Sequence, residues 1–181
     1  MALVTFSELL EDAFIDPDRV DYALLRELYV HSPSYLPFGR DERAVARLHQ
    51  ELASERFEEA VETVESLLVV DPLSIALRLA YAHALDGIDD DWEAATQRAF
   101  ANGLIKAMLR SGDGRSEATA IVVLDERERS LTLELLDLQA KTSRTHRHDG
   151  AWYEHIECLC GRELILDVSW PQGWLMAMAS S

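Results

Sequence analysis

Apolar residues recur three and four positions apart through most of the first 110 residues, which is the spacing of one face of an α-helix. The pattern predicts helices over residues 6–14, 18–30, 44–52, 57–68, 72–84 and 92–109. Asp71 is expected to cap the fifth helix and Pro72 to begin it, because the first helical position needs no N–H donor. Two prolines and a glycine in residues 31–39 predict a connection.

The pattern changes after residue 110. Residues 118–124 form a short apolar run, and residues 129–138 alternate in part between apolar and polar, which favours strands. Residues 152–159 and 163–170 predict a β-hairpin with the three-residue loop 160–162. That loop places the apolar side chains of the hairpin on one face: Trp152, Ile156, Cys158, Leu164, Leu166, Val168 and Trp170. The other face holds Tyr153, His155, Glu157, Glu163 and Asp167.

Helices first and strands last predict an α+β protein. We expect residues 1–110 to form tetratricopeptide-like helical hairpins, and residues 111–181 to form a small antiparallel β-sheet packed on them as one compact unit. The helix before Pro72 resembles the second helix of a tetratricopeptide repeat, with small Ala60 at the family's small position. The family period of about 34 residues takes Ala60 to Ala94. A generic helical bundle is the alternative.

The composition is that of a globular protein, but the charge is strongly acidic. The chain has 33 Asp and Glu residues and 17 Lys and Arg residues, which gives a net charge of −16. Nucleic acids and anionic membranes are polyanions, so this charge argues against both and leaves open a basic protein partner, a cation or plain solubility. No stretch approaches the roughly 18 apolar residues of a membrane span, and acidic residues interrupt any signal-like segment near the N-terminus. We therefore expect a cytoplasmic protein.

The second predicted helix and its exit carry a distinctive set of residues: Asp21, Tyr22, Leu25, Arg26, Tyr29, Ser32, Tyr35 and Pro37. A Ser-Gly-Asp-Gly stretch follows the last predicted helix at Ser111–Gly114, and an aromatic-rich strand with an acidic residue lies at Leu166–Ser169. Together they resemble an uncharacterised bacterial family known only as a domain of unknown function. The resemblance spans most of residues 21–170 and implies an architecture but no chemistry. Members of that family often look secreted, whereas this sequence shows no signal.

Potential metal ligands crowd into residues 146–160: His146, His148, Asp149, His155, Cys158 and Cys160. Imidazole, carboxylate and thiolate are the groups that zinc prefers. The hairpin register places Cys158 in the apolar layer and Cys160 in the turn, so we expect a buried cysteine beside a polar loop, and no cofactor. A metal site built from these histidines and cysteines is the alternative. The basic stretch 141–148 is expected to be a solvated loop.

Two further groups are candidate partner-binding residues. Arg26, Tyr29, Ser32 and Tyr35 combine an arginine with aromatic rings, which is frequent in binding surfaces, although packing of the 31–39 connection would use them equally well. Asp113 offers a carboxylate in the turn Ser111–Gly114. The simpler interpretation of that turn is a helix end with Gly112 as its C-cap residue.

The leading hypothesis is a non-enzymatic protein-interaction module that neutralises or chaperones a basic partner, as an immunity-type protein does. Helical hairpins present a groove, and acidic residues along its sides would speed association with a basic partner. One alternative is a metal-dependent or hydrolytic enzyme that uses the 146–160 cluster or Asp113. Another is a structural subunit of a homo-oligomer in which Trp170, Trp174 and residues 175–178 are buried between chains.

Overall fold

The computed structural model describes residues 4–38 and 41–179. The chain divides into two compact units, one ending at Ile105 and the other beginning at Lys106, and each has its own apolar core. Whether the helical and β regions pack as one compact unit stays a prediction. Within the described ranges, no helix is both long and apolar enough to cross a lipid bilayer.

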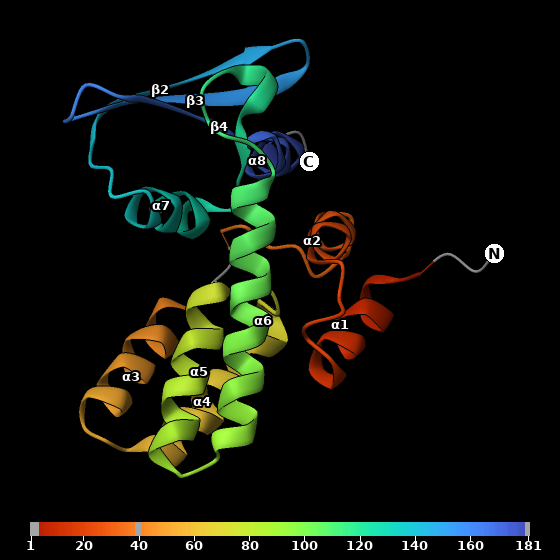
Figure 1. Cartoon of the computed structure of the whole chain (residues 1–181), viewed down its shortest axis with the longest axis vertical. Helices are drawn as coiled ribbons and strands as arrows, with labels where there is room; N and C mark the ends of the chain where they lie inside the picture. Colours follow the sequence, from red (N-terminus) through yellow and green to blue (C-terminus); the bar gives the residue numbers. More distant parts are fainter. Residues whose placement is uncertain (1–3, 39–40, 180–181) are drawn as a thin grey trace. The chain divides into compact units, whose positions relative to one another are not determined.

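The described part of the first unit contains helices and no strand, as the apolar spacing predicts (Figure 1). The helices are α1 (Phe6–Ile15), α2 (Tyr22–Val30), α3 (Glu42–Ala53), α4 (Phe57–Val70) and α5 (Ile75–Gly87), while α6 (Asp91–Arg110) begins here and ends in the second unit. Side-chain oxygens cap the N-termini of α1, α2, α3 and α5 by accepting backbone N–H groups, at Thr5, Asp21, Asp41 and Ser74.

The start of α5 corrects the prediction for Asp71 and Pro72. Asp71 is the C-cap of α4, and α5 begins only at Ile75, where Ser74 Oγ accepts the N–H of Leu77 at 3.3 Å. A residue before proline avoids the helical conformation, so the chain leaves α4 at Asp71. Arg78 stabilises the turn that follows, because its Nη2 atom donates a hydrogen bond to the Pro72 carbonyl at 2.7 Å.

Helices α3, α4 and α5 pack in sequence order around a small apolar core (Figure 1). Its buried members are Leu48, Ala60, Val64, Leu67, Leu77 and Ala84. Ala60 and Ala94, the two positions that the repeat pattern singles out, are both 0% exposed. Small side chains at buried positions let neighbouring helices approach closely, which is what the tetratricopeptide-like pattern requires.

Arg78 joins several elements of the first unit although it is 1% exposed. Its guanidinium lies 4.9 Å from the ring centre of Phe14 and 3.9 Å from that of Phe100. Nη1 donates to Gln97 Oε1 and Nη2 donates to the Pro72 carbonyl, both at 2.7 Å. Burial lowers the pKa of Arg78 to about 10, so the side chain is a cation at neutral pH. One buried cation thus links α1, α5, α6 and the turn between α4 and α5.

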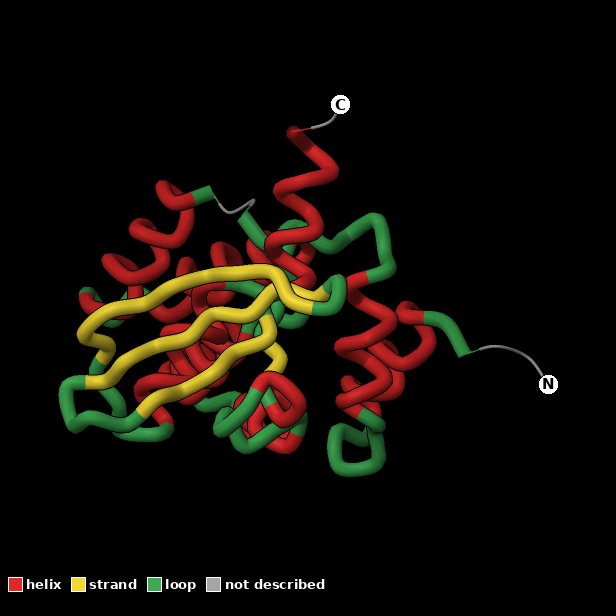
Figure 2. The backbone as a smooth tube through the Cα atoms, turned by 90° about the horizontal axis from the view of Figure 1, so that it is seen from above, coloured by secondary structure: helices red, strands yellow, loops and turns green. Residues whose placement is uncertain are grey.

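The second unit is a four-stranded sheet with helices. Its elements are η1 (Glu117–Thr119), β1 (Ile121–Val122), α7 (Glu126–Leu135), β2 (Ala140–His148), β3 (Ala151–Cys158), β4 (Glu163–Asp167) and α8 (Ser169–Ala179). The strand order is β1-β4-β3-β2, with the three longer strands side by side (Figure 2). The α+β class is confirmed, but the sheet is mixed, because β1 pairs with β4 in parallel.

Three predicted elements of this unit differ from the structure. Residues 129–138 were expected to extend as a strand, yet Asp125 caps the helix α7 there. Arg129 holds this helix to the sheet by donating from Nε and Nη2 to the two carboxylate oxygens of Glu154, at 2.7 and 2.8 Å. The basic stretch 141–148 is the edge strand β2, not a loop, because it pairs along its length with β3. Trp170 belongs to α8, since β4 ends at Asp167.

The hairpin of β3 and β4 has the predicted faces but a different loop. The backbone N–H of Cys158 donates to the Arg162 carbonyl at 2.8 Å, so the three loop residues are Leu159, Cys160 and Gly161. The whole pairing is therefore shifted relative to a loop at 160–162, and Ile156 lies opposite Leu164. Gly161 has φ +81°, which a side chain would strain, and its place at the end of the loop sets this register. Because the shift moves residues along the strands without turning them over, the predicted apolar face is confirmed: Ile156, Cys158, Leu164, Leu166 and Val168 are all buried.

The turn after α6 corrects the role predicted for Gly112. Gly114, not Gly112, adopts the left-handed conformation, with φ +67°. Its N–H donates to the Thr119 carbonyl and its carbonyl accepts from Ile165 N–H, each at 2.8 Å, so the turn is tied to η1 and to β4. Gly112 is needed for space, because a Cβ there would lie 2.3 Å from the Thr119 carbonyl oxygen.

We predict that Arg78→Ala lowers the free energy of unfolding by about 3–5 kcal/mol, because it opens a cavity and leaves the buried Gln97 and Pro72 oxygens without donors. Urea unfolding of the full chain measures the effect. Arg78→Lys is the matched variant: it keeps the charge but loses the flat group between the two rings, and should recover only part of the loss. A fully stable lysine variant would contradict the role given to the aromatic contacts.

Candidate metal centre

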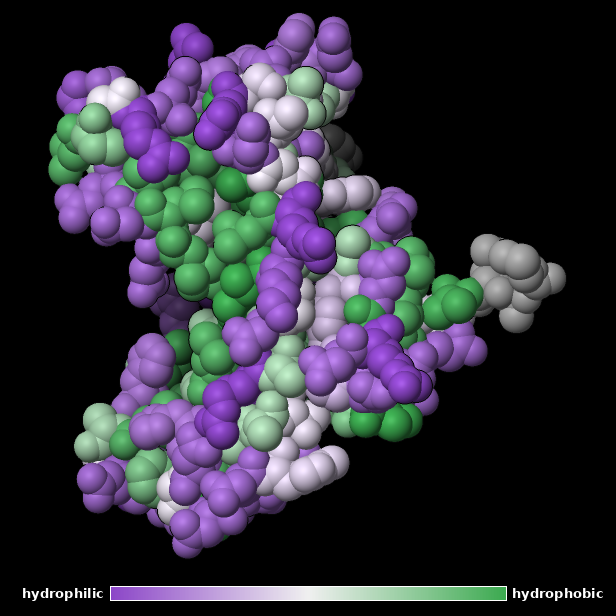
Figure 3. Space-filling view, viewed as in Figure 1, coloured by the Kyte–Doolittle hydropathy of each residue, from purple (hydrophilic) through white to green (hydrophobic). Residues whose placement is uncertain are grey.

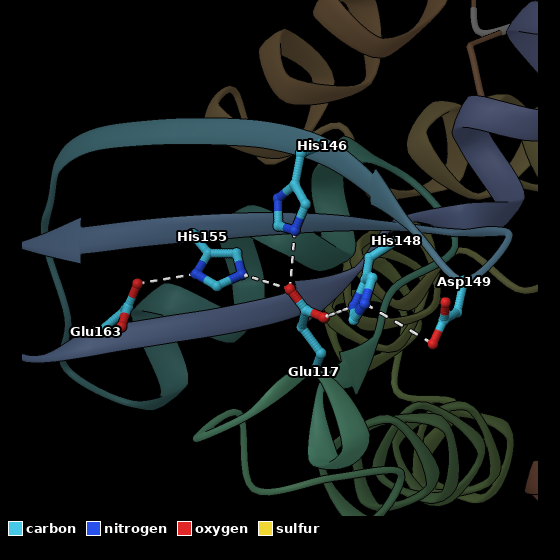
Figure 4. A network of polar contacts seen from close by, with 6 residues as sticks. All are labelled: Glu117, His146, His148, Asp149, His155 and Glu163. Carbon is cyan, nitrogen blue, oxygen red and sulfur yellow. Dashed lines mark hydrogen bonds and ion pairs between the residues drawn. The ribbon is translucent and has the colours of Figure 1, made fainter.

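Four side chains from three separate elements meet on the polar face of the sheet in the second unit. Glu117 comes from η1, His146 and His148 from β2, and His155 from β3 (Figure 4). In Figure 3, mostly hydrophilic residues lie along the top edge of the second unit, where Figure 1 shows the strands of the sheet. The opposite face packs on the apolar core.

Strand geometry positions the histidines. Side chains two residues apart on a strand point the same way, so His146 and His148 share one face of β2. His146 lies opposite Tyr153 and Arg144 lies opposite His155, which makes His146 and His155 diagonal neighbours on that face. Their ring centres are 4.9 Å apart.

The turn before η1 brings Glu117 over the strands. Asp113 Oδ1 accepts from the Arg115 N–H at 3.1 Å and from the Thr119 hydroxyl at 2.6 Å, which closes the turn around Glu117. These bonds hold the pKa of Asp113 below its usual value. Asp113 is therefore used in building the turn, although a partner-binding role for it stays a prediction.

Glu117 is the centre of the cluster. Its Oε1 lies 2.8 Å from His146 Nε2 and 3.3 Å from His155 Nε2. Its other oxygen, Oε2, contacts His148 Nδ1. One carboxylate therefore faces three imidazoles, two on one oxygen and one on the other (Figure 4).

A second carboxylate lies behind His155. Glu163, the first residue of β4, places Oε1 2.9 Å from His155 Nδ1. With a metal ion bound, Nδ1 would donate to Glu163, and the Nε2 atom, no longer donating to Glu117, would offer its lone pair to the ion. His146 differs, because its Nδ1 is buried and has no hydrogen-bond partner among the described residues.

The electrostatics of the cluster follow from these contacts. Hydrogen bonds from His148, and then from His146 and His155, lower the pKa of Glu117 to about 2. The bond to Glu117, with added attraction from Asp149, raises the pKa of His148. Glu117 is thus an anion throughout the physiological range of pH.

Three ligand atoms, one each from Glu117, His146 and His155, all lie within 4.8 Å of one another. Two atoms bound to one tetrahedral zinc ion at about 2.1 Å lie about 3.4 Å apart. The separations of 2.8 and 3.3 Å from Glu117 Oε1 to the two Nε2 atoms are close to that value. The group could therefore surround a metal ion after small side-chain movements.

The structure assembles only part of the cluster predicted from the sequence. His146, His148 and His155 come together, whereas Cys158 and Cys160 do not join them. Cys158 is 1% exposed on the apolar face, where burial raises the pKa of its thiol, and Cys160 is exposed in the hairpin loop. Glu117 was missed, since no local spacing connects a residue in a distant turn with a histidine on β2. Glu163 was placed on the same hairpin face as His155 but was not assigned to the cluster.

The remaining predicted site residues, Arg26, Tyr29, Ser32 and Tyr35, belong to the first unit. Arg26, Tyr29 and Tyr35 are 6, 5 and 7% exposed. Tyr29 packs against Tyr35 with ring centres 5.4 Å apart, and the Ser32 hydroxyl is buried without a partner among the described residues. A partner-binding role for these four residues stays a prediction, and their burial lends it no support.

The chain belongs to the family described as a domain of unknown function, DUF4919, whose model matches residues 10–156. This confirms the resemblance to an uncharacterised domain family, while its bacterial origin and Ser-Gly-Asp-Gly motif stay predictions. The matched segment includes Glu117 and all three histidines, and ends before Glu163. Comparison with curated proteins and with solved structures gave no match.

We predict that Glu117→Gln lowers the pKa of His148 toward its ordinary value in metal-free protein, because the variant removes the carboxylate that raises it. An NMR titration of the histidine ring protons measures the shift. Glu163→Gln is the matched control: it removes a carboxylate that contacts His155 and should leave His148 unchanged. If the pKa of His148 were the same in Glu117→Gln as in wild type, the side chains of Glu117 and His148 would not be in contact.

Proposed function

We propose that the second unit binds one divalent transition-metal ion, with Glu117, His146 and His155 as its ligands. The observation that carries the proposal is the convergence of three ligand atoms, from η1, β2 and β3, within 4.8 Å of one another. Two imidazoles and one carboxylate suit zinc and also ferrous iron, whereas Mg²⁺ and Ca²⁺ prefer oxygen ligands alone.

The surroundings of the ligands support this assignment. Metal-binding histidines commonly donate their second ring N–H to a carboxylate, as His155 Nδ1 is placed to do with Glu163. A ligating carboxylate is commonly held by a further hydrogen bond, and His148 supplies one to Glu117 Oε2. His148 thus acts in positioning Glu117.

Three protein ligands leave at least one coordination position open. Closed four-ligand sites are typical of structural zinc, while three ligands with an open position are typical of catalytic zinc. The side chains of Glu117, His146 and His155 are 25, 31 and 19% exposed, so a small molecule can reach them. These features favour a metal-dependent enzyme over the non-enzymatic role that the sequence suggested first.

We predict that the full chain binds about one Zn²⁺ and that His146→Ala and His155→Ala each weaken binding at least about 100-fold, because each removes a ligand. Glu163→Gln, which removes only the support of His155, should weaken it by about tenfold. Calorimetry with chelator competition measures these affinities, with circular dichroism as a check of folding.

Cys160→Ser is the matched control, because Cys160 is exposed in a loop and is absent from the cluster. Zinc affinity should be unchanged in this variant. Wild-type protein without zinc, cobalt or ferrous-iron binding would overturn the proposal, and a loss of binding in Cys160→Ser would move the ligands to the cysteines.

A protein-interaction module for a basic partner is a second proposal, and one observation in the first unit favours it. Trp92 is 72% exposed at the start of α6, directly after the exposed acidic run Asp89, Asp90 and Asp91. An exposed tryptophan beside negative charge combines the two features that bind basic surfaces, an aromatic anchor and electrostatic attraction. Immunity-type neutralisation of a toxin is one form of this proposal.

We predict that Trp92→Ala reduces retention of basic proteins by the immobilised chain at low salt, because it removes the aromatic anchor. The measurement is mass spectrometry of proteins captured from a lysate and released by salt. Val69→Ala is the matched control, since Val69 is 81% exposed on another helix, α4. If Trp92→Ala and Val69→Ala retained basic proteins equally well, Trp92 would be excluded as a contact with the partner.

The remaining predictions concern assembly and location. A homo-oligomer would use α8, where Leu175, Met176 and Met178 are 40, 56 and 59% exposed. Both this assembly and a cytoplasmic location stay predictions.

A further inference from the structure

Arg144 lies beside the candidate metal centre on the same face of the sheet. It is directly opposite His155 in the pairing of β2 with β3. Residues so paired have Cβ atoms about 5 Å apart and side chains on the same side. Two positions along β2, His146 supplies another ligand of the centre. The Arg144 side chain therefore lies next to His155, at one side of the metal centre.

The guanidinium of Arg144 has no hydrogen-bond or ion-pair partner among the described residues, although the chain carries 33 acidic residues. Arg127 and Arg129 of α7 differ, since they pair with Asp125 and Glu154, whereas Arg147 on the same strand as Arg144 also has no such partner among the described residues. Carboxylates on this face of the sheet already have partners: Glu117 contacts three histidines, Glu163 contacts His155, and Glu157 pairs with Lys141. Arg144 thus has five N–H donors to offer an external ligand.

We propose that the metal centre takes a phosphate-type oxyanion, held between the open coordination position of the ion and the guanidinium of Arg144. This inference rests on the metal-binding function proposed above. A guanidinium binds two oxygens of one anion at once through parallel N–H donors. A bound cation prefers a further oxygen in its open position.

The number of oxygens selects phosphate over carboxylate. A tetrahedral phosphate offers two oxygens to Arg144 and a third to the ion. A carboxylate has only two oxygens, so in a two-point contact with the arginine one of those oxygens would also have to bind the ion. The substrate class that fits is a phosphate ester or free phosphate.

Arg147 provides an internal comparison. It lies on the same strand, is exposed like Arg144, and is opposite Trp152. Because three positions separate the two arginines, Arg147 points to the other face of the sheet. Replacing either arginine by alanine removes one positive charge from β2. Only Arg144→Ala removes it from the face of the sheet that carries the metal centre.

The experiment uses the full chain loaded with Co²⁺, whose visible spectrum reports on its coordination, and titrates it with inorganic phosphate. We expect phosphate to alter the spectrum of wild-type protein, and Arg144→Ala to weaken phosphate binding at least about tenfold with cobalt affinity unchanged. Arg147→Ala should bind phosphate as wild type does. Acetate, titrated in parallel, should bind more weakly than phosphate and should lose less affinity in Arg144→Ala.

The outcomes separate the two proposals. A chain that binds no cobalt or zinc overturns metal binding and the phosphate site with it. A chain that binds the metal but no phosphate, or whose phosphate affinity falls equally in both alanine variants, overturns the phosphate site alone. Acetate binding as tight as that of phosphate, and equally dependent on Arg144, also overturns the choice of a tetrahedral anion. A selective loss in Arg144→Ala supports the inference.

Discussion

The pairing register of β2, β3 and β4 is the constraint on which both faces of the second unit depend. Neighbouring side chains on a strand point to opposite faces, so one register sends one set to the core and the other to the polar face. Ile156 and Leu164 are buried by this pairing, and His155 is placed among the other ligands. A one-residue slip would exchange the faces, and each large apolar side chain exposed would cost about 1.5–3 kcal/mol. The burial that stabilises the core therefore also fixes the histidines.

Glu117 reaches the histidines by a different route, through a turn and not through strand pairing. Gly114 connects the turn to β4 by accepting from Ile165, and Asp113 closes it by accepting from Thr119. Glu117 is consequently held against the same sheet that carries its partners. Side chains whose backbone is already held by hydrogen bonds lose less conformational freedom when a ligand binds, which favours binding.

Two arginines in contrasting surroundings show how an acidic chain uses its cations. Arg78 is buried, stacks on Phe14 and Phe100 and donates to two protein oxygens, so it serves the packing of the first unit. Arg144 is exposed beside a cluster of metal-ligand type and donates to no described residue. In a protein of net charge −16, the general field repels anions. An oxyanion would therefore depend on local groups that are precisely placed, and a bound ion together with Arg144 would supply them.

The sequence by itself determined the presence of the helices of the first unit, the length but not the position of the hairpin loop, and the apolar face of that hairpin, because each depends on spacing within a few residues. It also indicated a cluster of histidines at 146–155. Tertiary structure alone decided that residues 126–135 form a helix, which Arg129 anchors to Glu154 on the sheet. It also decided that Glu117 meets His146 across 29 positions, while Cys158 turns to the core. Local periodicity carries no information about which distant turn lies over which strand, and that placement is what turns three histidines into a candidate metal centre.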